Sequence, residues 1–385
     1  MEKMKIRRRA LKEGKVLFVR DEDTLYNLAT QTVRMIKSME IQDLLKITAE
    51  KKASDLIISH DATPALRVGG ELVSIDGKKL TAADTKRLVY ALLNAEQIDK
   101  FEQEWELDFS ITLPNLGRFR VNVHYQKNSV AAAIRYLSMD IPRFEDLRLP
   151  ESARELALKR RGLVLITGPS GSGKSTTLAA LIDIINSERA CHIITIEDPI
   201  EYVHTNKRSI VEQREVYTDT HSFADALKHV LRQSPDVILI GEMRDADTIK
   251  TAITAAETGH LVLATLHTID ACQTIDRIID IFTAEQQQQV RAQLSLCLQG
   301  IIAQTLLPRT EGAGQILAAE IMVMTDAISA AIRSGKNAQI YSYIQTGRMY
   351  GMQTLDYALK ELCTAGLIHY EAAAPYVRDL TYFRG

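Results

Sequence analysis

Residues 163–175 read Leu-Val-Leu-Ile-Thr-Gly-Pro-Ser-Gly-Ser-Gly-Lys-Ser, and no other segment of the chain indicates its fold as strongly. Its second part, Gly168–Ser175, matches the pattern G-x-x-x-x-G-K-[ST] at every fixed position. Leu163–Thr167 predicts a buried strand, and the apolar spacing of Ser175–Ile182 predicts an amphipathic helix. Because the pattern requires this order of strand, glycine loop and helix, we expect a phosphate-binding loop, and a glycine-rich structural turn is the alternative.

The residue types of this loop suit the phosphates of a nucleoside triphosphate. Glycines let successive backbone N–H groups turn toward the phosphates, and the N-terminus of the following helix adds positive potential there. We expect Lys174 to neutralise the outer phosphates and the Ser175 hydroxyl to bind Mg²⁺. The expected nucleotide-binding residues of the loop are Gly168, Pro169, Ser170, Gly171, Ser172, Gly173, Lys174, Ser175 and Thr176.

The composition is that of an ordinary globular protein. The 385 residues are 46% hydrophobic and 25% charged, and this length fits roughly two to three domains. The net charge of −2 gives no overall attraction to nucleic acid, so a helicase is disfavoured and no nucleic-acid partner is expected. The apolar runs are shorter than the roughly 18 residues that span a bilayer, and the N-terminus is charged where a signal peptide is apolar, so we expect a cytoplasmic protein. The four cysteines form no C-x-x-C pair, and neither a zinc site nor a disulfide framework is expected.

Changes of pattern divide the chain into segments. Residues 1–38 begin with a basic run and predict a loosely attached extension, with a basic arm for membrane lipid or nucleic acid as the alternative. Residues 39–142 predict a small α/β domain, and residues 143–150 a linker. In residues 151–324, near-continuous apolar strands alternate with amphipathic helices such as 223–233 and 246–257, which predicts a parallel sheet covered on both faces. Residues 325–385 are expected to be helical.

Two acidic segments follow predicted strands. Residues 196–202 read Ile-Glu-Asp-Pro-Ile-Glu-Tyr, and Glu242 ends the apolar strand that begins at Asp236. Since ligands bind at the carboxyl ends of strands in open α/β sheets, these acids are expected beside the phosphate loop. Hydrolysis needs a group that orients or deprotonates water and carboxylates for the metal shell, and Glu201 and Glu242 suit these roles. The alternative for Asp198, Asp245 and Asp247 is to cap helix N-termini.

A histidine stands at each end of the predicted strand in Thr258–His267. His260 and His267 are seven residues apart, so their side chains point to opposite faces and a shared metal ion is not expected. His267 is at the carboxyl end, on the nucleotide side, where a γ-phosphate sensor is favoured over a structural histidine. For His260 both interpretations stay open.

Together these segments resemble the secretion ATPase superfamily, and within it the PilT-like retraction ATPases of type IV pili. The resemblance rests on the phosphate loop, on I-E-D-P-I-E-Y, on a strand that ends in G-E-x-R-D, and on T-G-H-L-x-L-A-T-L-H-T. It extends from about Met39 to Tyr370, and further segments read as in that family: Arg161–Leu163, Leu231–Gln233, Ala256–His260 and Gly351–Leu355.

The resemblance implies a PAS-like N-terminal domain and a RecA-like ATPase domain with ATP between them. It implies a homohexamer at the cytoplasmic face of the inner membrane, held there only through partners: a pilus platform protein and, as an open alternative, a paralogous pilus ATPase. By position, Lys174 and Ser175 would bind phosphate and Mg²⁺, and Glu201 would be the general base. Glu242 would be the metal-binding acid of the second Walker motif, directly or through water, and His260 and His267 would form a histidine box.

Three arginines of the N-terminal domain are further candidates for nucleotide binding. Arg118, Arg120 and Arg135 occupy the region from which such ATPases bring arginines to the phosphates. There they would stabilise the charge that spreads over the γ-phosphoryl group. The alternative is that they are solvated arginines on an exposed sheet face.

Two differences from the family patterns bear on whether the ATPase retracts or assembles a pilus. The chain lacks the four-cysteine metal module usual in pilus-assembly and type II secretion ATPases, which favours retraction. The C-terminal pattern A-I-R-N-L-I-R-E associated with retraction appears as Ala327–Ser334, where Ser329 and Ser334 replace Arg and Glu, so an accessory retraction ATPase stays open. The sequence therefore predicts a hexameric, Mg²⁺-dependent ATPase that drives pilus retraction and twitching motility, with an assembly or secretion ATPase as the main alternative. A non-motor nucleotide-binding regulator would lack a base, which Glu201 argues against.

Overall fold

The structure is a computed structural model, and it describes residues 40–68, 71–75, 77–114, 116–137, 141–311 and 314–384. The extension expected at residues 1–38 lies outside these ranges. The chain divides between Leu137 and Ser138 into two compact units, each of which is described by itself. The domain boundaries expected at residues 142, 150 and 324 stay predictions.

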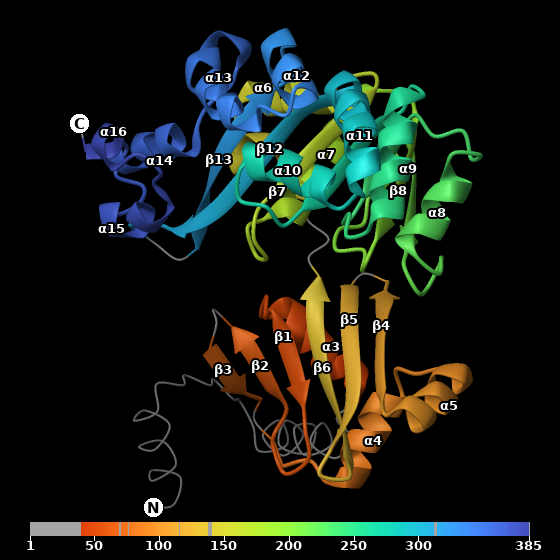
Figure 1. Cartoon of the computed structure of the whole chain (residues 1–385). Coiled ribbons are helices and arrows are strands. Elements are labelled where there is room, and N and C mark those ends of the chain that lie inside the picture. Colours follow the sequence, from red (N-terminus) through yellow and green to blue (C-terminus); the bar gives the residue numbers. More distant parts are fainter. Residues whose placement is uncertain are drawn as a thin grey trace, which may run out of the picture. The chain divides into compact units, whose positions relative to one another are not determined.

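The first unit is an antiparallel sheet of strand order β3-β2-β1-β6-β5-β4 (Figure 1). Its strands are β1 (Asp55–Ile58), β2 (Ala65–Val68), β3 (Glu71–Ser74), β4 (Glu106–Leu113), β5 (Gly117–Gln126) and β6 (Ser129–Leu137). Its helices are α3 (Ile41–Glu50), α4 (Ala82–Tyr90) and α5 (Ala95–Glu104). Thr81 and Asn94 start α4 and α5 by accepting hydrogen bonds from backbone N–H groups of the first turn.

Side chains alternate across this sheet, so each strand has one face toward the helices and one away from them. Phe119, Val121 and Val123 of β5 are fully buried in a core that includes residues of all three helices. Arg118 and Arg120 alternate with them and therefore lie on the opposite face, where Arg118 is half-buried and Arg120 exposed.

The second unit is built on a sheet of strand order β13-β12-β7-β11-β10-β8-β9, parallel except for the β12–β13 pair. Its strands are β7 (Gly162–Thr167), β8 (His192–Glu197), β9 (Ile210–Glu215), β10 (Val237–Ile240), β11 (Leu261–Leu266), β12 (Leu298–Pro308) and β13 (Gln315–Val323). Its α-helices are α6 (Glu151–Ala157), α7 (Lys174–Glu188), α8 (Phe223–Val230), α9 (Ala246–Glu257), α10 (Ala271–Asp280), α11 (Ala284–Cys297), α12 (Asp326–Arg333), α13 (Ile340–Thr346), α14 (Leu355–Thr364), α15 (Tyr370–Ala373) and α16 (Leu380–Arg384). Short 3₁₀ turns are η1 (Phe144–Leu147), η2 (Asn337–Gln339), η3 (Gly347–Tyr350) and η4 (Ala374–Tyr376).

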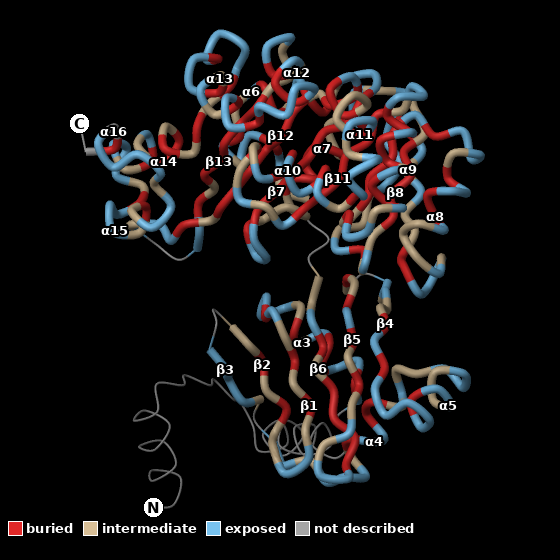
Figure 2. Tube along the Cα trace, viewed as in Figure 1, coloured by how far each residue is buried: buried red, intermediate tan, exposed pale blue. Residues whose placement is uncertain are grey.

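Helices cover both faces of this sheet, as the sequence predicts. Val164 and Ile166 of β7 pack toward α6 and α7, while Leu163 and Leu165 pack toward the side of α8 to α13. Figure 2 shows the central strands almost wholly buried, in agreement with their near-continuous apolar sequences. At the β13 edge of the sheet, α14 to α16 pack on the ends of β12 and β13. The C-terminal region is therefore helical, as expected.

Two details differ from the sequence-based expectation. The helix expected over 223–233 ends at Val230, because the next residues make turn hydrogen bonds and Ser234, at a φ of 55°, precedes Pro235. The antiparallel β12–β13 pair was not predicted. Within the described ranges, no helix combines the length and the apolar character needed to cross a bilayer.

Candidate active site

The loop between β7 and α7 has the conformation of a phosphate-binding loop. Gly168 and Gly173 have φ values of 144° and 86°, and Gly173 directly precedes the first residue of α7. A Cβ atom at Gly168 would collide with the carbonyl oxygen of Gln304 and would lie 2.5 Å from Ser172 Oγ. Gln304 of β12 also donates from Nε2 to the Ser172 carbonyl oxygen at 2.7 Å, which fastens the loop to the sheet.

Lys174 folds back over this loop. Its Nζ donates to the carbonyl oxygens of Gly168 at 2.8 Å and Pro169 at 3.0 Å. Burial lowers the pKa of Lys174, and the negative charges of Glu242 and Glu201 oppose that change. Both carboxylates therefore lie near enough to the lysine to act on its charge.

The strand order brings the predicted catalytic side chains to one edge of the sheet. The neighbouring strands β7, β11, β10 and β8 run parallel, so their carboxyl ends meet. The phosphate loop follows β7, and His267, Glu242 and Glu197 stand at the ends of the next three strands. The cavity at this edge, of about 300 Å³, is lined by Ser170, Gly171, Lys174, Ser175, Glu197, Glu201, Tyr202, His204, Glu242 and His267, among others.

His267 connects Lys174 to Glu242. Lys174 Nζ lies 3.5 Å from His267 Nδ1, and His267 Nε2 lies 2.9 Å from Glu242 Oε1. An ammonium group only donates hydrogen bonds and a carboxylate only accepts them, so this network assigns the tautomer with the proton on Nε2. His267 thus links the phosphate-binding lysine to the acid at the end of β10.

Glu242 is held as a carboxylate. Burial by itself raises the pKa of Glu242, but the hydrogen bond from Arg244 Nε at 2.8 Å, the charge of Arg244 and the neighbouring His267 bring it below the ordinary value. Ser175 lines the same cavity. Hydroxyl and carboxylate oxygens fit Mg²⁺, which takes one or two protein ligands and completes its shell with phosphate oxygens and water.

Glu197 has a different environment. Its Oε1 accepts hydrogen bonds from Thr195 Oγ1 at 2.6 Å and from Gln213 Nε2 at 3.0 Å. Burial nevertheless dominates and raises the pKa of Glu197 to about 7, with a further increase from the charge of Glu201. Glu197 is therefore a poorer permanent anion than Glu242.

Glu201 is exposed and lines the cavity. Its neighbour Tyr202 is fixed by two contacts: its hydroxyl lies 3.0 Å from Thr176 Oγ1 in the first turn of α7, and its carbonyl accepts from Gln213 Nε2 at 2.8 Å. The structure thus presents the Glu201 carboxylate to the space beside the phosphate loop.

His260 is not among the residues that line the cavity. It lies at the other end of β11, where its Nδ1 is 2.9 Å from the Ala255 carbonyl oxygen and its own carbonyl accepts from Gly162 N. Its role with the nucleotide stays a prediction. Of the three aspartates with a capping alternative, Asp245 caps α9 by accepting from Thr248 N at 2.8 Å.

The three arginines share one face of the sheet in the first unit. Arg120 and Arg135 are directly opposite each other on β5 and β6, and Arg118 precedes Arg120 by two residues on β5. Arg135 Nε pairs with Asp55 at 3.0 Å, and Arg118 Nη1 donates to Thr112 Oγ1 at 3.0 Å. Their contact with phosphate stays a prediction.

Sequence reasoning missed several residues that shape the site. Arg244 stands within the quoted G-E-x-R-D segment but was given no role, although it is the direct partner of Glu242. Gln304 and Gln213 carry no local motif, because their contacts with Ser172 and Glu197 join residues far apart in the sequence. Thr195 lies only two residues from its partner Glu197 and was given no role.

Comparison with known proteins identifies the relatives of this chain. Residues 41–365 match the family described as type II/IV secretion system protein. The chain is 48% identical over 335 residues to the Pseudomonas aeruginosa protein named type IV pilus retraction ATPase PilT, a match that covers 87% of this chain and 97% of that protein. It is 43% identical over 335 residues to type IV pilus ATPase PilU of the same organism, covering 87% and 88% of the two chains.

A solved structure agrees with the fold. The crystal structure described as the pilus retraction motor PilT with bound ADP matches with a TM-score of 0.85 and 48% identity, over 90% of this chain and 99% of that one. The expected fold, a RecA-like domain with a smaller N-terminal α/β domain and a helical C-terminus, is confirmed. The chain belongs to the type II/IV secretion system protein family, whose members include nucleotide-binding ATPases of type IV pili.

Proposed function

We propose that this chain is an ATP-hydrolysing motor that drives retraction of a type IV pilus. The observation that carries the proposal is the match to a retraction ATPase over nearly its whole length. The Lys174–His267–Glu242 connection beside an intact phosphate loop supports the same reaction. The reaction is the attack of water on the γ-phosphoryl group of ATP.

Different residues of the chain have different roles in this hydrolysis. Lys174 exchanges its two carbonyl partners for phosphate oxygens, which form stronger charge-assisted hydrogen bonds. Glu201 accepts the proton of the attacking water, because it is exposed at the cavity while Glu242 is occupied by Arg244 and His267. His267 contacts both Lys174 and Glu242, so a change at the γ-phosphate reaches the acid at the end of β10.

We infer that Ser175 and Glu242 hold Mg²⁺, Ser175 directly and Glu242 directly or through water. When bound, the ion neutralises charge on the β- and γ-phosphate oxygens. Glu242 is suited to this role because its pKa lies below the ordinary value, so it stays ionised at neutral pH.

The motor is proposed to work as a homohexamer at the cytoplasmic face of the inner membrane, attached through a pilus platform protein. Arg118, Arg120 and Arg135 are the residues proposed to reach the phosphates when the domains close. Their common sheet face supports this assignment, because one movement of that face would deliver all three.

A specific observation favours a second candidate, an accessory retraction ATPase. Ser329 and Ser334 occupy α12 and its C-terminal end, where the retraction pattern has Arg and Glu. Ser329 Oγ donates to the Ser295 carbonyl oxygen of α11 at 2.8 Å, so in this chain the position makes an internal contact.

The test is ATP hydrolysis by the purified full-length protein with and without Mg²⁺, beside Lys174→Ala. Hydrolysis that requires Mg²⁺ and is lost in the variant is expected. Persistent hydrolysis in Lys174→Ala, or none in the native protein under any assembly condition, would overturn the proposed reaction.

A further inference from the structure

The connection that carries Glu201 is fastened to the helix that begins at the phosphate loop. Residues 198–209, here called the Glu201 loop, join β8 to β9 without a helix or a strand of their own. A catalytic carboxylate on such a segment needs contacts that fix it. Those contacts are made with β9 and at two places along α7.

The front attachment is beside Glu201 itself. Tyr202 contacts Thr176 of α7 and Gln213 of β9, as described above. The Gln213 side chain also accepts from His204 N at 2.8 Å, and Ile200 N donates to Glu215 Oε2 at 3.1 Å. Most of these hydrogen bonds join neutral groups, and each contributes only modestly to the stability of the folded loop.

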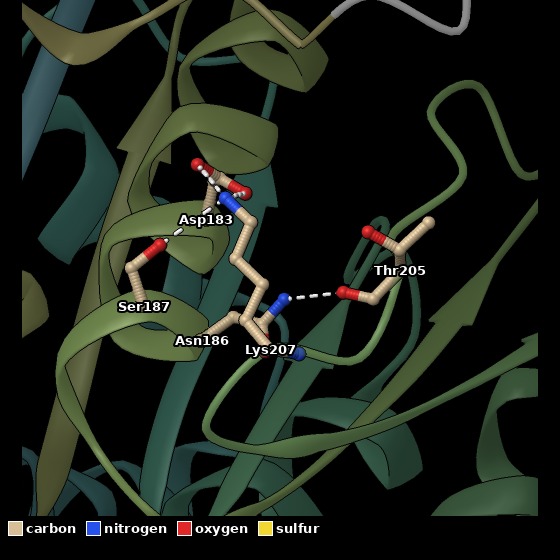
Figure 3. A network of polar contacts seen from close by, with 5 residues as sticks. All are labelled: Asp183, Asn186, Ser187, Thr205 and Lys207. Carbon is tan, nitrogen blue, oxygen red and sulfur yellow. Dashed lines mark hydrogen bonds and ion pairs between the residues drawn. The ribbon is translucent and has the colours of Figure 1, made fainter.

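The rear attachment is made by Asp183, Asn186 and Ser187 of α7 with Thr205 and Lys207 of the loop, here called the clamp (Figure 3). The Lys207 ammonium lies 2.6 and 2.9 Å from the two Asp183 carboxylate oxygens and 3.2 Å from Ser187 Oγ. The fully buried Asn186 side chain donates to the Thr205 carbonyl at 2.8 Å and accepts from Lys207 N at 3.1 Å. The clamp therefore combines a charge-assisted contact with paired backbone groups.

Helix geometry explains how the two attachments work together. Thr176, Asp183 and Ser187 are seven and eleven residues apart, so they share one side of a helix with 3.6 residues per turn. From Thr176 to Ser187 the helix rises about 16 Å. The chain from Tyr202 to Lys207 spans about 17 Å when fully extended. The loop thus reaches from the first turn of α7 to its C-terminal part, and release of its rear end frees the segment behind Glu201.

We propose that the clamp positions Glu201 for catalysis by holding the loop against α7, which also carries Lys174 and Ser175. This inference rests on the proposed ATPase function. Asp183, Asn186 and Lys207 act through Glu201, as positioning residues without contact to the nucleotide. Their removal should change turnover and leave nucleotide binding in place.

The test uses Lys207→Met, because Lys207 is on the surface, whereas Asn186 is buried and supports several backbone groups. We expect kcat to fall about tenfold to a hundredfold, as misplacement of a reacting group does. KM and the affinity for a fluorescent ADP analogue are expected to stay within about twofold, since the phosphate loop is untouched. Lys207→Arg, and the charge exchange Asp183→Lys with Lys207→Asp, should recover most of the turnover.

Arg154→Met is the matched control. Arg154 of α6 pairs with Glu188, the last residue of α7, and the exposed fractions of that pair, 33% and 41%, resemble the 42% and 31% of Lys207 and Asp183. The control removes an equally exposed ion pair from the same helix without contact to the Glu201 loop. An equal loss of kcat in Arg154→Met and Lys207→Met would mean that the loss of any ion pair to α7 lowers turnover, whether or not the Glu201 loop is held. That result would overturn the inference.

Hydrogen exchange separates this inference from the proposed function. In Lys207→Met, peptides that cover residues 200–209 should exchange roughly tenfold faster, while α9 is unchanged. This measurement does not require hydrolysis. Unchanged exchange in the loop would refute the clamp even in an active enzyme, whereas faster exchange in a protein without ATPase activity would support the clamp and refute the proposed reaction.

Discussion

Glu197 and Glu201 are four residues apart and have opposite surroundings. Glu197 lies among neighbours that donate to its carboxylate and deprive it of water, while Glu201 is exposed at the cavity. Both line the cavity, and we propose that the more exposed Glu201 takes the proton of the attacking water. The sequence marked Glu201 through its resemblance to a family, and the local environment supports the same choice.

We predict that Glu201→Gln binds ATP normally and loses most of its turnover. The change keeps the size of the side chain and removes the proton acceptor, which typically costs about 10²–10⁴ in rate. The measurement is single-turnover hydrolysis together with analogue binding. Near-normal hydrolysis would remove Glu201 as the base and move the role to Glu197 or Glu242.

We predict a pH-dependent effect of Glu197→Gln on stability. The pKa of Glu197 rises from 4.5 to about 7 on folding, so the folded protein binds the proton more tightly. The carboxyl group therefore favours the folded state less and less as pH rises from about 4.5 to 7. Glutamine carries no charge, so the melting temperature of the variant relative to the native protein should increase between pH 5 and pH 8. A difference that does not vary with pH would mean that the pKa of Glu197 is not raised by folding.

At the scale of elements, the sequence revealed what is local and missed what depends on topology. The phosphate loop and the strands around it were predicted because one continuous segment carries the whole signal. The contact of His267 with Glu242 depends on β11 lying between β7 and β10, and strand order is not written in any single segment. The hairpin β12–β13 was missed because a short apolar run has the same pattern in a strand and in a buried helix. The Asn186–Thr205 contact joins a helix to a loop that has no periodicity at all.

We predict that two glycines of one loop respond differently to alanine. Gly168 and Gly171 both have positive φ values, so alanine strains both. A Cβ at Gly168 collides with Gln304 and Ser172, whereas a Cβ at Gly171 meets nothing within 4 Å. Gly168→Ala should therefore weaken nucleotide binding much more than Gly171→Ala, as measured by titration with a fluorescent ADP analogue. Equal losses would show that backbone strain, and not close packing against β12, decides the shape of the loop.

At the scale of the whole molecule, turnover is proposed to need more than one subunit. If Arg118, Arg120 or Arg135 completes a neighbour's site, an arginine variant offers an intact phosphate loop while Lys174→Ala offers the arginine. Mixing the two inactive proteins should then restore part of the ATPase activity. Absence of recovery in mixed rings verified by mass spectrometry would place the arginine in its own subunit's site or outside catalysis.

Cells that lack this chain show whether its ATP hydrolysis retracts a pilus. Their surface pili are counted by electron microscopy and their twitching is measured on agar, with the native chain or Glu201→Gln restored as controls. We predict surface pili, in larger numbers than in the parent, together with impaired twitching that the native chain corrects and Glu201→Gln does not. Cells without pili would contradict a role in retraction and assign the motor to pilus assembly.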